Sequence, residues 1–552
     1  MKKRWVIADT DPALTVTLAA ALNMPAALAR VLVNRGYRDA EAARQFLNPQ
    51  LRQLADPFAL PDMAAAVDRV RTAIANRERI VIYGDYDVDG VTSSALLLLV
   101  LRAAGAFVAN FLPQRMDEGY GLSVDGIARC LREHQPQLLI AVDCGTTAVV
   151  EIAGLKADGV DVIVLDHHEP SERLPECVAI VNPKRAGREP FASVGVAFKL
   201  AHALLKREPG LQERIDLRDH LDLVAVGTVA DMVPLTGENR VLVKAGLERL
   251  PHTRKTGLRA LMKIANVPDE VSPHHIGFRI GPRLNAAGRL SDAMAALELL
   301  LTEDTGRAEE LAKLLHEHNA DRQELEEKIV AEALAQAQKF AGDRVLVLAD
   351  PAWHAGVIGI VASRVLHAFY RPTVVIGTDG KGSCRSVTGF SIVAALTECA
   401  EVLVRFGGHE MAAGLSVLPE NIGELRVRLN AVAARTLREE DLMPRLAIDA
   451  VVELAEVDEE FIGAMDRFEP CGQENPSPLF AVRGVRLRGG AREVGKGHLK
   501  FQLTDGMATV DAIWFGGVAQ GLPAGAMDVA FVPELNEFRG ATTVQMHVRD
   551  VQ

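Results

Sequence analysis

Three aspartates at alternate positions, Asp85, Asp87 and Asp89, form a compact group of potential metal ligands. They follow the apolar run 80–82 closely, and Gly90 ends the motif. Three carboxylates held this close repel one another unless cations neutralise their charge. An acidic loop after a strand can also be a solvated turn that caps a helix, so this motif alone leaves both interpretations open.

A second group of potential ligands consists of Asp166, His167 and His168, which follow the apolar run 162–165. It adds imidazole nitrogen to carboxylate oxygen. Mixed ligands of this kind suit Mn²⁺ or Mg²⁺, and the nitrogen favours Mn²⁺. The two groups together indicate a metal centre rather than an isolated turn.

Two further aspartates occupy comparable places. Asp143 follows the apolar run 138–142, and Asp231 follows the mostly apolar segment 221–230. If each apolar run is a strand of one parallel sheet, its carboxyl end lies at the edge where such folds bind ligands. We therefore expect four strand ends to converge on one metal centre, which is typical of a metal-dependent hydrolase.

The elements that must position these ligands alternate between strand and helix over residues 79–304. We expect strands over 79–84, 137–142, 161–165 and 179–181, and helices over 91–104, 147–157 and 193–206. Alternation of this kind, with apolar β-branched strands, predicts an α/β domain built on a parallel sheet. Residues 1–78, with proline punctuation, are expected to form an N-terminal extension of short helices.

A charged helical pattern continues over 305–340. A helix of about 35 residues is ~50 Å long and can connect two domains. A second α/β domain is expected over 341–440. It contains the glycine-rich stretches 353–360, 382–386 and 407–414. Glycines beside helix starts would expose backbone N–H groups to an anion, so these stretches together indicate phosphate binding.

A further arginine-rich motif spans residues 278–289. Guanidinium groups among small residues suit phosphate, although they could equally bridge two protein surfaces.

The C-terminal region 445–552 shows five short strand-like runs separated by glycine and proline turns. These runs are 479–488, 498–503, 508–514, 528–533 and 542–549. They predict a small barrel of the OB type. The stretch 483–500 carries six basic residues and one acidic residue, so it offers a local site for a nucleic-acid backbone although the net charge of the chain is −12.

Composition excludes several classes of protein. Without eighteen uninterrupted apolar residues, the sequence does not indicate a membrane protein. Asp9 and Asp11 interrupt the apolar start of the sequence before a signal-peptide core can form, so we do not expect a secreted protein. The six cysteines lie far apart and form no C-x-x-C pair, which argues against a zinc site or a disulfide framework. We expect a cytoplasmic protein.

The motifs resemble those of the RecJ family of bacterial single-stranded-DNA exonucleases, which are DHH phosphoesterases. The stretches that carry the resemblance span nearly the whole chain and are 83–90, 142–145, 166–168, 229–235, 281–290, 353–364 and 405–414. The first four indicate the superfamily, and the others, with the expected barrel, narrow it to RecJ. The resemblance implies a ring-like enzyme of DNA repair and recombination that degrades single strands 5′ to 3′ and releases 5′-mononucleotides.

Carried over residue by residue, the resemblance implies two Mn²⁺ or Mg²⁺ ions. Their predicted ligands are Asp85, Asp87, Asp89, Asp143, His167 and Asp231. Asp143 is the expected bridging ligand, and His168 is expected to contact substrate or handle a proton. The residues expected to hold the 5′-phosphate or DNA are Arg283, Arg289, Ser383, Arg385, Gly408 and His409, with Arg483, Arg486 and Arg488 on the barrel.

The resemblance also implies partners, namely single-stranded DNA, a single-strand-binding protein and a RecQ-type helicase, and we expect a monomer. Two other functions stay open. A short-oligonucleotide or dinucleotide phosphodiesterase of the same superfamily would need only the two α/β domains. A noncatalytic replication scaffold would have lost metal ligands that this sequence retains.

Overall fold

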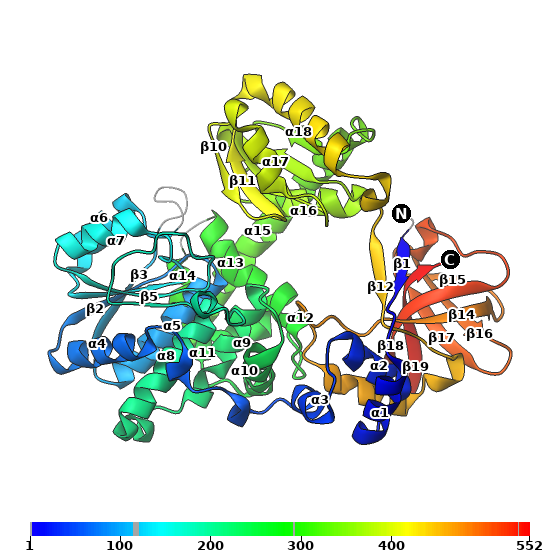
Figure 1. Cartoon of the computed structure of the whole chain (residues 1–552), viewed down its shortest axis with the longest axis horizontal. Coiled ribbons are helices and arrows are strands. Elements are labelled where there is room, and N and C mark those ends of the chain that lie inside the picture. The colour runs from blue at the N-terminus through cyan, green and yellow to red at the C-terminus, as the bar shows by residue number, and fades with distance from the viewer. Residues whose placement is uncertain (1–2, 114–120, 291–292, 539) are drawn as a thin grey trace. The chain divides into compact units, whose positions relative to one another are not determined.

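The computed structural model describes residues 3–113, 121–290, 293–538 and 540–552 (Figure 1). The chain forms two compact units. The first unit comprises Arg44–Ala320 and Phe468–Ser477, and the second comprises Met1–Ala43, Asp321–Arg467 and Pro478–Gln552.

The first unit is built on a five-stranded sheet of order β3-β2-β4-β5-β6, in which every pairing is parallel. The strands are β2 (Arg79–Tyr83), β3 (Phe107–Phe111), β4 (Leu138–Val142), β5 (Asp161–Leu165) and β6 (Ala179–Val181). β4 is buried along its whole length, which explains its uninterrupted apolar sequence. The sequence analysis missed β3 but placed the other four strands.

Helices cover both faces of this sheet. One apolar core joins alternate strand residues such as Ile82 and Ile140 to α4 (Met63–Ala75), α5 (Val88–Ala103) and α8 (Ser193–Arg207). The other core joins the opposite face to α6 (Val124–His134) and α7 (Val149–Ala157). Because helices cover both faces of the sheet, polar ligands of such folds bind beyond the carboxyl ends of the strands.

The segment expected to be the fourth ligand-bearing strand is a helix, α9 (Leu221–Ala230). Eight of its ten residues are buried, so an apolar helix surrounded by protein reads in sequence like a buried strand. The prediction that Asp231 follows a strand was therefore wrong.

The remaining helices of this region are α3 (Ala40–Leu47), α10 (Gly237–Arg249), α11 (Thr256–Ile264), α12 (Pro273–His275), the π-helix η7 (Ile276–Ile280), α13 (Gly281–Leu290) and α14 (Met294–Leu301). Helix α15 (Thr305–Gln338) matches the predicted long helix closely and contributes residues to both units.

The second unit contains a five-stranded sheet of order β10-β11-β9-β8-β7. Its strands are β7 (Leu346–Ala349), β8 (Thr373–Ile376), β9 (Lys381–Arg385), β10 (Arg405–Gly408) and β11 (Ala412–Ser416), and its helices are α16 (Ile358–Phe369), α17 (Ile392–Glu398) and α18 (Ile422–Thr436). The glycine-rich stretches 382–386 and 407–414 lie largely in antiparallel strands, not beside helix starts as expected. Alternating small residues fit a strand because each second residue packs into the core.

The C-terminal part of the second unit is a barrel. Its strands are β13 (Ala450–Val451), β14 (Phe480–Leu487), β15 (Arg492–Val494), β16 (His498–Thr504), β17 (Thr509–Trp514), β18 (Met527–Phe538) and β19 (Ala541–Val551). β14 pairs with both β18 and β16, which closes the five long strands into a ring. This arrangement confirms the predicted barrel.

The N-terminal extension includes the helices α1 (Pro12–Leu22) and α2 (Ala26–Asn34). It also supplies a strand that the sequence analysis missed, β1 (Arg4–Ile7), which pairs in parallel with β12 (Arg445–Ile448). Helix α19 spans Glu459–Met465. In the described ranges, no single helix is long and apolar enough to cross a membrane, although α1 and α2, bent by 117°, pass that test as a pair.

Candidate metal centre

The loop between β2 and α5 holds the three alternating aspartates. Asp87 is the N-cap of α5, and its Oδ1 accepts hydrogen bonds from the backbone N–H groups of Asp89 (2.9 Å) and Gly90 (3.1 Å). A Cβ on Gly90 would lie 2.4 Å from the carbonyl oxygen of Asp85, so only glycine allows the loop to fold this tightly. The helix-capping and metal-binding interpretations of this motif are thus compatible.

Asp89 is held by the N-terminus of α8. Its two carboxylate oxygens accept hydrogen bonds from the backbone N–H groups of Ser193 (2.6 Å) and Val194 (2.9 Å). The Ser193 hydroxyl donates to Oδ1 of Asp143 at 3.1 Å. Exposed N–H groups and the helix dipole both favour negative charge at this position. The sequence analysis gave no role to Ser193, whose only signal is its place at the start of a predicted helix.

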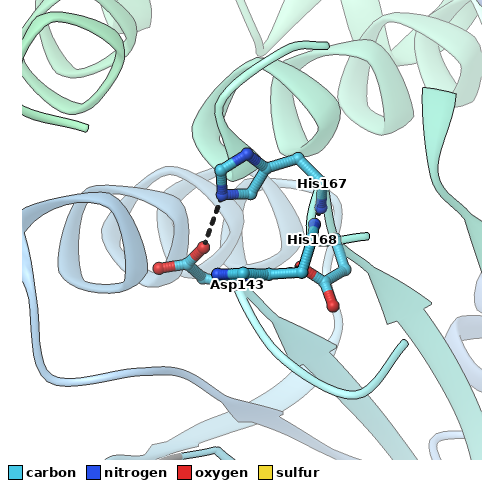
Figure 2. A group of neighbouring side chains, drawn as sticks. Asp143, His167 and His168 are labelled. Atoms are coloured by element: carbon cyan, nitrogen blue, oxygen red, sulfur yellow. Dashed lines mark hydrogen bonds and ion pairs between the residues drawn. The ribbon is translucent and has the colours of Figure 1, made fainter. Parts of the chain in front are cut away.

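His167 lies at the centre of the carboxylates. Its Nε2 is 3.3 Å from Oδ1 of Asp143, 3.4 Å from Oδ2 of Asp231 and 3.9 Å from Oδ2 of Asp89. Figure 2 shows its ring facing the Asp143 carboxylate. Ligand atoms of Asp89, His167 and Asp231 lie within 4.8 Å of one another, as do those of Asp85, Asp87 and Asp143.

Two buried polar atoms in this cluster point to a bound ligand. Among the described residues, His167 Nε2 and Asp231 Oδ2 have no hydrogen-bond partner. A buried polar atom without a partner costs free energy unless something else binds it. Because the donors are oxygens with one imidazole nitrogen, the set fits a divalent cation such as Mn²⁺ or Mg²⁺.

The pKa values of the cluster residues also agree with binding of a divalent cation. Burial and then the charge of neighbouring aspartates raise the pKa of Asp89 to about 7 and that of Asp231 to about 9. The same two causes raise the pKa of Asp143 well above its usual range. Burial lowers the pKa of His167 to about 4, so its imidazole is neutral and able to act as a ligand at pH 7. Bound cations would favour the ionised carboxylates.

His168 has a different setting from His167. Its Nδ1 lies 2.7 Å from Oδ1 of Asp166, which also accepts hydrogen bonds from the backbone N–H groups of His167 and His168. Although burial acts in the opposite direction, the hydrogen bond to Asp166 raises the pKa of His168. Burial alone would raise the pKa of Asp166, but the hydrogen bonds from His168 and from the Thr146 N–H lower it. Asp166 therefore orients His168 with Nδ1 occupied.

A supporting network behind His168 was not predicted. The side-chain amide of Asn182, which follows β6, donates to Thr146 Oγ1 (3.1 Å) and to the carbonyl of His168 (2.9 Å). Asn182 is fully buried. The available signal was its position directly after a predicted strand, 179–181.

The arginine-rich motif is partly structural. Asn285 Oδ1 accepts a hydrogen bond from the Val88 N–H (3.1 Å), and a Cβ on Gly288 would lie 2.6 Å from the Tyr86 carbonyl. The motif therefore packs directly on the acidic loop. Arg283 donates through Nε to His316 Nδ1 (3.1 Å) and through a terminal nitrogen to the Arg279 carbonyl (2.6 Å). The side chain of Arg289, also predicted to bind phosphate, lies outside the described part of the structure.

The predicted phosphate residues of the second unit lie on one sheet. Arg385 donates to Ser383 Oγ (3.2 Å) and to the Cys384 carbonyl (2.8 Å). Among the described residues it has no carboxylate partner within 4 Å, and burial lowers its pKa. Gly408 ends β10 with φ +141°, and the N–H of His409 donates to the Ala412 carbonyl, so both belong to the β10–β11 hairpin.

The barrel residues Arg483, Arg486 and Arg488 are exposed on or just after β14. Arg488 donates to Thr509 Oγ1 at 3.2 Å. None of the three arginines forms an ion pair with the described carboxylates. Exposed, uncompensated guanidinium groups suit a nucleic-acid backbone.

Comparison with known proteins gives consistent matches along the chain. Residues 79–228 match the DHH family, N-terminal domain, residues 342–435 the DHHA1 domain, and residues 448–550 the RecJ OB domain. Over 565 residues the chain is 39% identical to the single-stranded-DNA-specific exonuclease RecJ of Bacillus subtilis, with 100% of this chain and 71% of the relative covered.

Solved structures agree. RecJ from Thermus thermophilus in complex with Mn²⁺ superposes with a TM-score of 0.88 at 34% identity, covering 100% of this chain and 79% of that one. The complex of the same protein with Mg²⁺ gives a TM-score of 0.82 at 32% identity, covering 100% and 78%.

Proposed function

The chain belongs to the RecJ family of single-stranded-DNA-specific exonucleases, and we propose that it degrades single-stranded DNA from the 5′ end to 5′-mononucleotides with two divalent cations. The observation that carries this proposal is the buried cluster of carboxylates around His167, two atoms of which have no hydrogen-bond partner among the described residues.

Two groups of residues would hold the ions, either Mn²⁺ or Mg²⁺. Asp85, Asp87 and Asp143 form one group, and Asp89, His167 and Asp231 form the other. When bound, two such ions stabilise the charge on the phosphoryl oxygens and lower the pKa of an attacking water. Asp143 belongs to one group and also lies 3.3 Å from His167 of the other, which supports the proposal that its carboxylate would contact both ions.

His168 is proposed to act on the substrate rather than to hold an ion. Asp166 occupies Nδ1 of His168 and fixes its tautomer, so Nε2 is the nitrogen that would exchange a proton or donate to a phosphate oxygen. The hydrogen bond also raises the pKa of His168, which favours donation near neutral pH.

Other residues are proposed to bind the DNA and to set the direction of degradation. Ser383, Arg385, Gly408 and His409 are proposed to hold the terminal 5′-phosphate. The half-buried guanidinium of Arg385, which has no carboxylate partner among the described residues, supports this. Arg283 and Arg289 of the first unit are proposed to contact the DNA. The barrel arginines Arg483, Arg486 and Arg488 are proposed to bind the DNA nucleotides further from the 5′ end.

The barrel also separates this proposal from the two alternatives. A dinucleotide phosphodiesterase would not need a barrel that binds a long DNA strand. Residues 448–550 match the RecJ OB domain. A noncatalytic scaffold does not need the cluster of buried carboxylates. We further propose that the enzyme works as a monomer in the cytoplasm, where bacterial DNA lies, alongside a single-strand-binding protein and a RecQ-type helicase.

The test is product analysis on a 3′-labelled, 5′-phosphorylated oligonucleotide with Mn²⁺. We expect a ladder that shortens from the 5′ end with release of 5′-mononucleotides, and no such ladder on duplex DNA or with Asp143→Ala. Labelled 3′ mononucleotide as the first product would refute the direction, and turnover by Asp143→Ala equal to wild type would refute the metal centre.

A further inference from the structure

The solvent side of the β10-β11-β9 sheet carries a second pair of cations beyond the proposed 5′-phosphate residues. The register pairs Ser383 with Gly414, and two residues further along β9 it pairs Lys381 with Ser416. Ser416 in turn pairs with Arg405 on β10. Directly opposed residues of antiparallel strands point to the same face, so Lys381 and Arg405 share the face of Ser383.

The opposite face of these strands is apolar core. Cys384, Ala413 and Leu415 are buried there against α17 and α18. On the face of Ser383, α16 covers β8 and β9 closely, since a Cβ on Gly359 would lie 3.2 Å from Ser383 Oγ. The outer strands β10 and β11 remain open on that face, because Arg405, Gly407 and Gly414 are exposed.

This open face is hollowed into a groove of about 360 Å³. The residues that line it are Lys381, Gly382, Arg405, Phe406, Gly407, Gly414, Leu415 and Ser416. A Cβ on Gly407 would meet nothing within 4 Å, and one on Gly414 only the Gly382 carbonyl at 3.9 Å. The space above the glycines is therefore available to a ligand.

The two cations at the groove lack a carboxylate partner among the described residues. Arg405 donates through Nε to Ser416 Oγ at 3.2 Å. Neither Arg405 nor Lys381 forms an ion pair with any carboxylate in the described ranges of the chain. Two cations on one concave face repel each other unless an anion lies between them.

We propose that this groove binds a second nucleotide phosphate, one step along the sheet from the phosphate assigned to Ser383 and Arg385. Two residues along a strand correspond to ~6.6 Å, so the two positions hold separate phosphate groups. In the proposed function, the next phosphate of a strand whose 5′-phosphate is held by Ser383 and Arg385 is the scissile one at the metal ions. The phosphate in the groove therefore belongs to a released mononucleotide. This inference rests on the proposed function for its biological ligand but not for the binding itself.

The experiment compares two kinds of variant of the full-length protein. Lys381→Ala/Arg405→Ala removes both charges, and Gly414→Val fills the groove without changing charge. A matched control, Lys328→Ala/Lys339→Ala, removes two exposed lysines of the same unit that form no ion pair with described carboxylates. Titration of dTMP into metal-free protein is followed by calorimetry, and KM and its salt dependence are measured on a 5′-phosphorylated oligonucleotide.

Loss of two charge-assisted contacts should weaken phosphate binding about tenfold or more. We expect dTMP affinity to fall in both groove variants and KM to stay unchanged. A raised KM in both variants, with the slope of log affinity against log salt lowered by about 0.7 per lost phosphate contact in the charge variant, would place the DNA strand in the groove and overturn the assignment to a mononucleotide.

Variants that match the control in KM, salt slope and dTMP affinity would overturn the inference. A wild type that binds dTMP at this groove but degrades no single strand would refute the proposed function and leave the phosphate site standing.

Discussion

Replacing Asp231 by asparagine should stabilise the metal-free protein while it destroys activity. Burial and the charge of Asp89 raise the pKa of Asp231 from 3.8 to about 9. Below pH 3.8 both folded and unfolded states hold the proton, and the group has no effect. Between these two pKa values the unfolded chain ionises while the folded protein keeps the proton, so metal-free stability falls as pH rises through this window.

The size of the effect follows from the same shift. At pH 7 the carboxyl costs at most about 4 kcal/mol, since about three pKa units at 1.36 kcal/mol each separate pH 7 from the unfolded pKa. A buried amide without a full set of partners offsets about 1–2 kcal/mol of this. Asp231→Asn should therefore gain about 2 kcal/mol, or several degrees in Tm.

The assay is thermal unfolding of wild type and Asp231→Asn in EDTA at pH 5 and pH 8.5, repeated with Mn²⁺. In EDTA the variant should melt close to wild type at pH 5, where the cost and the amide offset nearly cancel, and clearly higher at pH 8.5. With Mn²⁺ at a hundred times its Kd, wild type should gain about 2.7 kcal/mol and the variant much less. Exonuclease activity of the variant should fall roughly a hundredfold or more.

Asp222→Asn is the control, because Asp222 is a fully buried aspartate that pairs with Lys255 at 2.7 Å. Removing the charge of Asp222 leaves Lys255 without its ion-pair partner. This should lower the free energy of unfolding by about 3 kcal/mol or more under every condition. If Asp231→Asn lowers Tm in EDTA at pH 8.5, or keeps wild-type turnover, the reasoning from clustered carboxylates to a metal centre fails.

Three further predictions follow from the other residues. His168→Asn should lower kcat at least tenfold yet keep Mn²⁺ affinity by calorimetry, because the hydrogen bond to Asp166 orients the His168 ring. Lost Mn²⁺ affinity would instead make His168 a metal ligand. Arg385→Ala should slow degradation of 5′-phosphorylated strands by roughly ten- to a hundredfold and of 5′-hydroxyl strands much less, and equal losses on both would contradict 5′-end recognition. Reversing Arg486 and Arg488 to Glu should weaken binding of long strands, measured by fluorescence anisotropy, and reduce its salt dependence; an unchanged salt slope would show that this face is only solvated.

Much of the metal centre could be predicted because its ligands sit in local sequence motifs. Asp85, Asp87 and Asp89 lie within six residues after an apolar strand, and His167 follows another. Parallel strands place their carboxyl ends at one edge, so local pattern and fold class together bring these residues close. The same local logic found the long helix and the barrel strands.

Contacts between segments far apart in the chain were not predicted, and for Asp231, which was predicted as a ligand, the element expected to carry it was wrong. Asp231 reaches the centre from the end of a helix, and its neighbours in sequence do not distinguish a buried helix from a strand. Ser193 and Val194 hold Asp89 through backbone N–H groups, which any residue type can supply. Asn285 reads as part of a phosphate motif but bonds to Val88.

The sequence by itself thus determined which chemical groups the protein has and the strands that carry most of them, because hydrophobic periodicity and turn residues are local properties. Only the tertiary structure decided which aspartate faces which donor, that Asp166 orients His168, and that Lys381 and Arg405 share an open sheet face. Those facts depend on strand register and helix packing between segments far apart in sequence, and no local pattern encodes them.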